Sequence, residues 1–232
     1  MEHDGRNSGE PSAFLPPTAF VTYAQNHDQI GNRPFGERLN HLVSPACARV
    51  WAAIYLLSPQ IPMLFMGEEW GAGQPFMFFS DVGDDLADAI RTGRTEEMAS
   101  FPRREGQGAP PDPMAEETFR MCKLDWDART EGEHARFLSL YRRLIALRKK
   151  EIVPRLSGMG ANSGQFEVVN ERVVKVTWRL GDGSDLSLVA NLSAEPVHGL
   201  SLWGSDHLWL EGFATGDVLE GWSAVFSLKA KS

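Results

Sequence analysis

The sequence predicts an α/β region followed by an all-β domain, and three observations carry this prediction. Two short apolar runs, residues 19–24 and 61–66, each end abruptly in polar residues, as buried parallel strands do. A helix-length apolar stretch, residues 45–57, lies between them, and the order strand, helix, strand predicts parallel strands in a βαβ unit. From about residue 152 onward, apolar and polar residues alternate, which is typical of antiparallel strands.

The first 151 residues contain two further predicted helices. Residues 1–18 are rich in Gly, Pro, Ser and charge and are predicted to be irregular. A helix is expected over residues 86–101, within loops rich in Gly, Pro and Asp that extend from about residue 71 to 129. Apolar residues at helical spacing predict another helix over residues 133–150, whose basic end suits the helix dipole and which Pro154 closes.

The last third of the chain is predicted to form a small antiparallel, β-sandwich-like domain. Val174, Val176 and Trp178 alternate with polar residues, as do Leu186 and Leu188, and the turn sequence of residues 181–184 separates the two runs. This pattern predicts a β-hairpin. The predicted organisation is an irregular segment (1–18), an α/β domain (19–151) and the β domain (152–232).

Composition excludes several classes of function. The net charge of the 232 residues is −8, and the charges are interspersed, which argues against nucleic acid or an anionic membrane surface as the partner. No apolar run approaches the ~20 residues that span a bilayer, and the start has no secretory apolar region, so a cytoplasmic location is expected. Cys47 and Cys122 fit no metal-ligand spacing, and no metal site is predicted.

The most informative stretch is the polar run that follows the first predicted strand, from Gln25 to Arg33. An imidazole beside a carboxylate, as in His27–Asp28, can bind sugar hydroxyls and stabilise positive charge at an anomeric carbon. The amides of Gln25 and Asn26 can both donate to and accept from vicinal hydroxyls. From the residues alone, an Asn-His-Asp triplet is more often a capped turn than a functional site.

The run Gln25-Asn26-His27-Asp28-Gln29-Ile30-Gly31-Asn32-Arg33 resembles the fourth signature region of the α-amylase family, glycoside hydrolase family 13. Residues 58–71 are similar to the eighth barrel strand and the following loop of that family. The flanking residues resemble the malto-oligosyltrehalose trehalohydrolases more than amylases or branching enzymes. Over about residues 15–195 the likeness is dense and keeps chain order. It implies strands 7 and 8 of a (β/α)8 TIM barrel, followed by the β domain.

The resemblance implies roles for particular residues. Asp28 matches the third essential carboxylate, which stabilises the transition state, and His27 matches a histidine that binds hydroxyls of the reacting glucosyl unit. The other candidate substrate-binding residues are Asn26, Gln25, Gln29, Arg33, Glu69 and Trp70. The roles of Glu68, Asp81 and Arg94 stay open. Ion pairing is the favoured interpretation for Asp81 and Arg94, and loop packing is as favoured as sugar stacking for Trp70.

The resemblance also indicates what these residues do not supply. Retaining glycosidases need a nucleophile and an acid/base carboxylate, and in this family both precede the Asn-His-Asp region. Six earlier βα units do not fit into the 18 residues before the first predicted strand. The chain is therefore expected to be a carboxy-terminal fragment, inactive alone. Its expected partners are a maltooligosyltrehalose or α-glucan substrate and the amino-terminal part of the barrel, with no cofactor.

Two alternatives remain open. One is a non-catalytic carbohydrate-binding or regulatory remnant that keeps the sugar-facing loops. The other is a different member of the α-amylase family, such as a glucan branching enzyme, although Gln25, Gln29 and Asn32-Arg33 argue against it.

Overall fold

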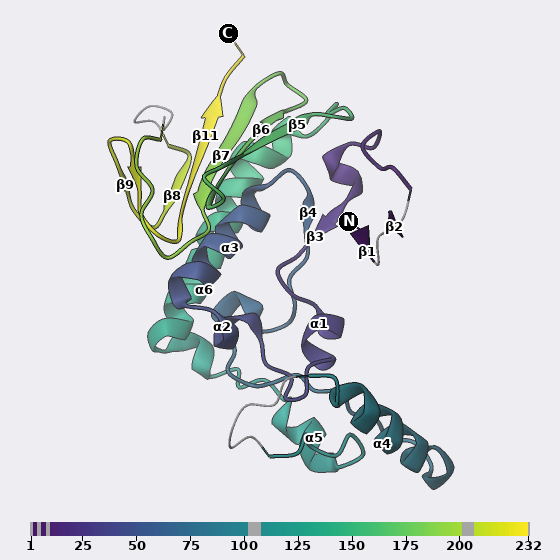
Figure 1. The fold of residues 1–232 in the computed structure, drawn as a ribbon. Coiled ribbons are helices and arrows are strands. Elements are labelled where there is room, and N and C mark those ends of the chain that lie inside the picture. The colour runs from purple at the N-terminus through teal and green to yellow at the C-terminus, as the bar shows by residue number, and fades with distance from the viewer. Residues whose placement is uncertain (1, 4–5, 8–9, 102–107, 201–206, 232) are drawn as a thin grey trace. The chain divides into compact units, whose positions relative to one another are not determined.

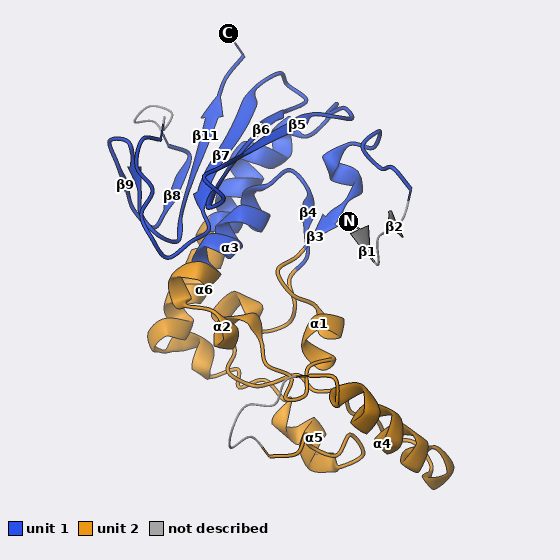
Figure 2. Ribbon diagram, in the orientation of Figure 1, with its two compact units in different colours: residues 1–22, 49–63, 144–232 blue, residues 23–48, 64–143 orange. Residues whose placement is uncertain are grey.

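The computed structural model describes residues 2–3, 6–7, 10–101, 108–200 and 207–231. The chain forms two compact units, the first made of residues 1–22, 49–63 and 144–232, the second of residues 23–48 and 64–143 (Figure 2). The first unit joins segments from both sides of residue 151. The domain boundaries at residues 18 and 151 therefore stay predictions from the composition and the hydrophobic pattern of the sequence.

The first unit is built on a five-stranded antiparallel sheet with the strand order β5-β6-β7-β11-β8 (Figure 1). Its strands are β5 (Gly164–Val169), β6 (Val173–Arg179), β7 (Asp185–Asn191), β8 (Trp209–Glu211) and β11 (Ser223–Lys229). Two short strands, β9 (Ala214–Thr215) and β10 (Val218–Leu219), form a separate antiparallel pair. One face buries a cluster that includes Val173, Val189, Leu219 and Val225.

The predicted hairpin is present as β6 and β7, with Trp178 opposite Leu186 and Val176 opposite Leu188. Leu186 and Leu188 are buried, as are the other residues of β7 after Asp185, and the turn between β6 and β7 contains Gly, Asp and Ser. Asp182 holds the turn by accepting hydrogen bonds from the backbone N–H of Ser184 at 2.9 Å and from its hydroxyl at 2.6 Å. The antiparallel β region predicted from the sequence is confirmed.

The first unit also contains the predicted parallel strand pair. Strand β3 (Val21–Thr22) pairs in parallel with β4 (Ile61–Pro62), Val21 opposite Ile61. Both are shorter than the predicted runs of residues 19–24 and 61–66. Helix α3 (Pro45–Leu57) connects them and has the predicted bounds. The βαβ order inferred from the sequence is therefore confirmed.

A buried arginine closes the carboxyl end of α3. Arg148, only 6% exposed, donates hydrogen bonds to the carbonyl oxygens of Leu56 (3.0 Å), Ser58 and Gln60 (2.6 Å). The last carbonyls of a helix lack partners within the helix, and this guanidinium supplies them. Burial lowers the pKa of Arg148 from its ordinary value.

The second unit is helical and contains α1 (His27–Gly31), α2 (Leu39–Leu42), α4 (Asp84–Met98), α5 (Glu116–Met121) and the first part of α6 (Gly132–Leu147) (Figure 1). Helices α4 and α6 correspond to the predicted helices at residues 86–101 and 133–150. The short helices α1, α2 and α5 were not predicted, because four to six residues give no readable apolar period.

Irregular turns complete the chain. The segments η1 (Pro17–Ala19), η2 (Glu68–Trp70), η3 (Ala128–Thr130) and η5 (Val153–Arg155) are 3-10 turns, and η4 (Arg148–Ile152) is a π turn that extends α6. Within the predicted irregular segment, β1 (Glu2–His3) and β2 (Arg6–Asn7) form a short antiparallel pair, which corrects that prediction locally. No helix in the described part of the chain is long and apolar enough to cross a membrane.

Candidate functional site

The Asn-His-Asp triplet lies at the start of helix α1, in the second unit. Asn26 is the N-cap residue: its side chain accepts a hydrogen bond from the backbone N–H of Gln29, and the side chain of Gln29 accepts one from the N–H of Asn26, both at 3.0 Å. This reciprocal capping box satisfies two donors at the helix start. The capped turn that the residue pattern favours is therefore present, and it fixes the backbone of residues 26–29.

The two residues inside this turn point their side chains to the surface. His27 and Asp28 are each 68% exposed at the side chain, and His27 Nε2 lies 3.2 Å from Asp28 Oδ1. The capping box occupies the backbone N–H groups of Asn26 and Gln29, and the imidazole and the carboxylate are exposed on the turn. They can offer a hydrogen-bond donor and a negative charge to a bound molecule.

Gln25, in contrast, is 4% exposed and is held inside the unit. Its amide NH2 donates to Glu68 Oε2 at 3.3 Å, and its amide oxygen accepts from the backbone N–H of Leu39 at 2.9 Å. Glu68 is also buried, and its other carboxylate oxygen accepts from the hydroxyl of Tyr141 at 3.0 Å. Gln25, the residue immediately before the capped turn, is therefore anchored inside the unit by Glu68, and neither side chain faces outward.

Trp70 and Glu69 are placed differently from each other. Trp70 is 2% exposed and packs against Trp126, with ring centroids 5.1 Å apart. Its carbonyl oxygen accepts a hydrogen bond from His134 Nδ1 at 2.8 Å. The loop-packing alternative thus describes Trp70 in this structure, whereas Glu69 is half-buried.

Arg38 is a residue whose structural role sequence reasoning missed. Its side chain is fully buried and donates to the carbonyl oxygens of Gln74 (2.6 Å) and Met66 (2.7 Å), and it lies over the ring of Phe65. Burial lowers the pKa of Arg38, while the nearby Glu68 carboxylate opposes that shift. A single arginine among polar neighbours gives no sequence signal of burial. Gly36, two residues before Arg38, adopts a left-handed φ of +59° in the structure.

Arg94 connects α4 to the end of α1. Its guanidinium donates to the carbonyl oxygen of Gly31 at 2.8 Å and to Asn32 Oδ1 at 3.1 Å, and it pairs with Glu97 at 2.6 Å. Arg33 pairs with Glu37 at 3.2 Å. The ion pairing favoured for Arg94 is present, whereas Asp81 is exposed and forms no ion pair with the described residues.

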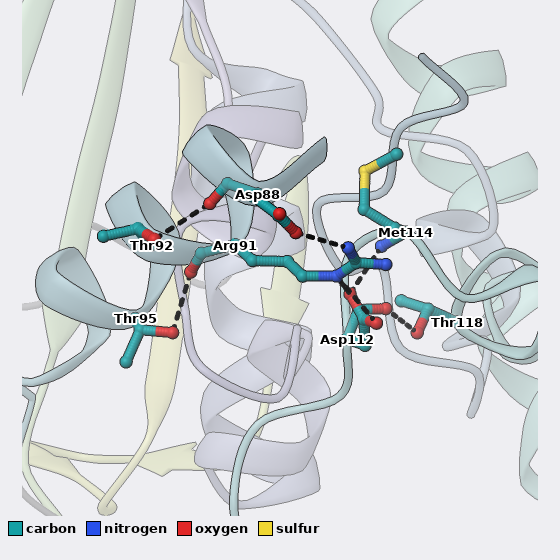
Figure 3. Close-up of polar contacts among 7 residues, drawn as sticks. All are labelled: Asp88, Arg91, Thr92, Thr95, Asp112, Met114 and Thr118. Carbon is teal, nitrogen blue, oxygen red and sulfur yellow. Dashed lines mark hydrogen bonds and ion pairs between the residues drawn. The ribbon is translucent and has the colours of Figure 1, made fainter. Parts of the chain in front are cut away.

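A cavity of about 310 Å³ opens beside these arginines. It is lined by one carboxylate, three guanidinium groups and mostly apolar residues: Asp112, Arg33, Arg91, Arg94, Pro34, Met77, Phe78, Thr95, Met98, Ala109, Pro110, Pro111 and Pro113. Arg91 Nε donates to both oxygens of Asp112 at 3.1 and 3.2 Å, and its Nη1 donates to Asp88 at 3.1 Å (Figure 3). A hydrogen bond from the backbone N–H of Met114 lowers the pKa of Asp112, and Arg91 lowers it further.

The described residues contain no cluster of three or more His, Cys, Asp or Glu side chains that could hold a metal ion. Cys47 and Cys122 are buried and are not joined by a disulfide. Cys122 lies 3.2 Å from the backbone N–H of Met77, and burial raises the pKa of its thiol.

Comparison with solved structures defines the class of protein. The chain superposes on a crystal structure named as a putative alpha amylase from Salmonella typhimurium with a TM-score of 0.88 and 40% identity, covering 97% of this chain and 38% of that one. It also shares the fold of the catalytic module of the glycogen-degrading pneumococcal virulence factor SpuA, with a TM-score of 0.54 and 16% identity over 93% of this chain and 37% of that one. The predicted fold class, the last part of an α-amylase-type barrel with its β domain, is confirmed.

Sequence comparison narrows the class. Residues 161–226 match a family described as a domain of unknown function, DUF3459. The chain is 47% identical over 145 residues (62% of this chain, 24% of the relative) to the malto-oligosyltrehalose trehalohydrolase of Deinococcus radiodurans. It is 39% identical over 197 residues (83% and 32%) to the trehalohydrolase of Rhizobium sp. strain M-11. The chain resembles the carboxy-terminal portion of malto-oligosyltrehalose trehalohydrolases and spans about a third or less of their length.

Proposed function

We propose that these residues form the carboxy-terminal portion of a glycoside hydrolase that releases trehalose from maltooligosyltrehalose. On this proposal Asp28 is the transition-state-stabilising carboxylate, and His27 binds hydroxyls of the reacting glucosyl unit. The observation that carries the proposal is the capped turn, which presents His27 and Asp28 together, 3.2 Å apart and 68% exposed. This turn belongs to a chain of which 83% aligns with a malto-oligosyltrehalose trehalohydrolase.

The physical argument concerns charge at the reacting carbon. Glycoside cleavage passes through a transition state resembling an oxocarbenium ion, and a nearby carboxylate stabilises its positive charge. Asp28 offers such a carboxylate on a backbone that the capping box holds in place. A nucleophile and an acid/base carboxylate about 5–5.5 Å apart are also required in retaining enzymes. On this proposal, the nucleophile and the acid/base carboxylate belong to a part of the enzyme outside these 232 residues.

The remaining predicted residues divide into two groups. Asn26 and Gln29 maintain the turn through their mutual hydrogen bonds, and Gln25 anchors it from inside the unit. Glu69 and Arg33 stay proposed substrate-binding residues, because neither is fully buried. The burial of Trp70 supports a packing role and not a sugar platform.

The proposal is tested by complementation. The chain is co-expressed with the amino-terminal segment of a related trehalohydrolase, and trehalose release from maltooligosyltrehalose is measured. We expect release by the complex, none by the chain alone, and loss of release in Asp28→Asn and His27→Ala. Asp127→Asn and His198→Ala are the matched controls, since both residues are exposed and lie outside the turn. Activity that survives Asp28→Asn in the complex would contradict the assigned role.

A further inference from the structure

We propose that the cavity lined by Arg33, Phe78, Arg91, Arg94 and Asp112 is a binding subsite for a short stretch of α-glucan. The neutral, polyhydroxylated class of ligand follows from the cavity itself. The choice of an α-glucan within that class rests on the proposed function. The subsite lies outside the capped turn of His27 and Asp28 and takes part in binding, not in bond cleavage.

The charge balance of the cavity argues for a neutral ligand. Three guanidinium groups line it, and each is paired with a carboxylate: Arg33 with Glu37, Arg94 with Glu97, and Arg91 with both Asp88 and Asp112. A phosphate or carboxylate ligand would have to compete with these anions and would meet Asp112 in the cavity wall. Uncharged hydroxyl groups meet no such repulsion, and they both donate and accept.

The lining offers the two kinds of surface that a sugar needs. Its apolar part comes from prolines, methionines and Phe78, which remains 41% exposed although Arg94 lies over its ring at 4.8 Å. Its polar part includes guanidinium N–H groups that have no partner among the described residues, at Arg91 Nη2 and at Arg33 Nη1 and Nη2. Ligand pockets commonly combine apolar walls with a few fixed polar groups in this way.

The polar groups are held in place before any ligand binds. Asp112 is fixed by the backbone N–H of Met114 at 2.9 Å, and its carbonyl oxygen accepts from the hydroxyl of Thr118 at 2.6 Å (Figure 3). Asp112 in turn positions Arg91 through two hydrogen bonds. Groups that are already ordered lose little conformational entropy on binding, which favours affinity for a flexible oligosaccharide.

The cavity is also connected to the proposed reaction site. Arg94 lines it and donates to the carbonyl oxygen of Gly31, the last residue of α1, whose first turn carries His27 and Asp28. Arg33, which follows α1 in sequence, lines it as well. A glucan bound here would therefore contact the same short segment that presents Asp28.

The test is a titration of the purified chain with maltoheptaose, followed by calorimetry and by backbone NMR shifts. We expect shifts centred on the cavity residues, and an affinity that falls about two- to tenfold in Phe78→Ala. Phe78→Leu keeps the apolar bulk and should lose part of that affinity, and Arg33→Met should weaken binding without unfolding the unit. Arg120→Met is the control, because Arg120 pairs with Glu116 in the same unit but does not line the cavity.

Two results would overturn the proposal. One is the absence of shifts at the cavity with maltoheptaose, and the other is binding of inorganic phosphate there, which would indicate an anion site. The outcome is separable from that of complementation. If maltoheptaose binds the cavity but the complex releases no trehalose, the subsite stands and the proposed function falls. If trehalose is released and Asp28→Asn abolishes its release, but maltoheptaose causes no shifts at the cavity, the proposed function stands and the subsite falls.

Discussion

The side-chain amide of Gln25 donates a hydrogen bond to the carboxylate of Glu68, 3.3 Å away and 43 residues further along the chain. Glu68 also accepts a hydrogen bond from the hydroxyl of Tyr141 in helix α6. The segment that follows β3, the loop that follows β4 and helix α6 therefore meet at one buried carboxylate. Residue 25 is directly followed by the capped turn of His27 and Asp28. The position of that turn therefore depends on Glu68.

Replacing Glu68 by Ala should destabilise the second unit by about 2–4 kcal/mol, because it removes the buried carboxylate that accepts hydrogen bonds from the side chains of Gln25 and Tyr141. Amide hydrogen exchange over residues 25–31 should increase with it. Glu69→Ala, at the half-buried neighbouring position, should change both quantities little. Equal exchange in the two variants would show that Glu68 does not hold the turn.

Arg148→Met should lower the free energy of unfolding of the first unit by about 2–4 kcal/mol, since it leaves several buried carbonyl oxygens at the end of α3 without a donor. Denaturant unfolding measures this loss. The control is Lys149→Ala, an exposed neighbour that should stay within about 0.5 kcal/mol of the parent chain. A cost for Arg148→Met as small as that of the control would contradict the capping role.

Gly36→Ala should destabilise the second unit by about 2–4 kcal/mol. The backbone at Gly36 has a φ of +59°, and an added Cβ would lie 2.6 Å from the carbonyl carbon and oxygen of Phe76. Gly93→Ala provides the opposite expectation. It lies inside α4 with open space around it, so the change should stabilise the helix by about 0.5–1 kcal/mol. Thermal unfolding of both variants tests the pair.

Asp182 should make the stability of the β6–β7 hairpin depend on pH in the acid range. The hydroxyl of Ser184, followed by its backbone N–H, lowers the pKa of Asp182 in the folded chain. A depressed carboxyl pKa contributes stability that is fully present above the unfolded value of about 3.9 and is lost as pH falls through the lower, folded value. NMR titration should show a carboxyl pKa below its usual range. Ser184→Ala should raise it toward that range, and an unchanged value would contradict the assignment.

The parallel pair β3–β4 should make the isolated chain prone to self-association. Val21 is 55% exposed and Ile61 is 51% exposed, and among the described residues each strand pairs only with the other. Unpaired strand edges with apolar side chains seek partners. We expect binding of a dye for exposed apolar surface and concentration-dependent light scattering, both reduced by the complementing amino-terminal segment. A monodisperse monomer that binds no dye would contradict this.

The sequence predicted the long, periodic elements well. Helix α3 has its predicted bounds, and the β6–β7 hairpin follows from runs of apolar residues on either side of a turn whose residues favour reversal. The strands β3 and β4 are shorter than their apolar runs because hydrogen-bonded pairing, not hydrophobicity, defines a strand's length. Among the described residues, each has only the other as a pairing partner.

The candidate site was predicted less evenly. The triplet Asn26-His27-Asp28 was identified through its resemblance to a signature region of a known family, and the capped turn that its residues alone favour is present, with Asn26 as the N-cap. The burial of Gln25, Arg38 and Trp70 was not readable, because it depends on residues tens of positions away. The cavity at Arg91 and Asp112 likewise depends on a loop meeting α4, which no local pattern encodes.

The registers of the two sheets also imply an order of events during folding. Trp178 meets Leu186 across a short turn, whereas Val21 meets Ile61 only after α3 and its flanking loops have closed. Loop-closure entropy rises with the length of chain enclosed, and hairpins form in about 1–10 μs. In refolding, β6 and β7 should therefore become protected from exchange early, and β3 and β4 late. For a polypeptide made from its amino terminus, the strand that precedes the Asn-His-Asp turn would wait for its β4 partner until residue 61 has emerged.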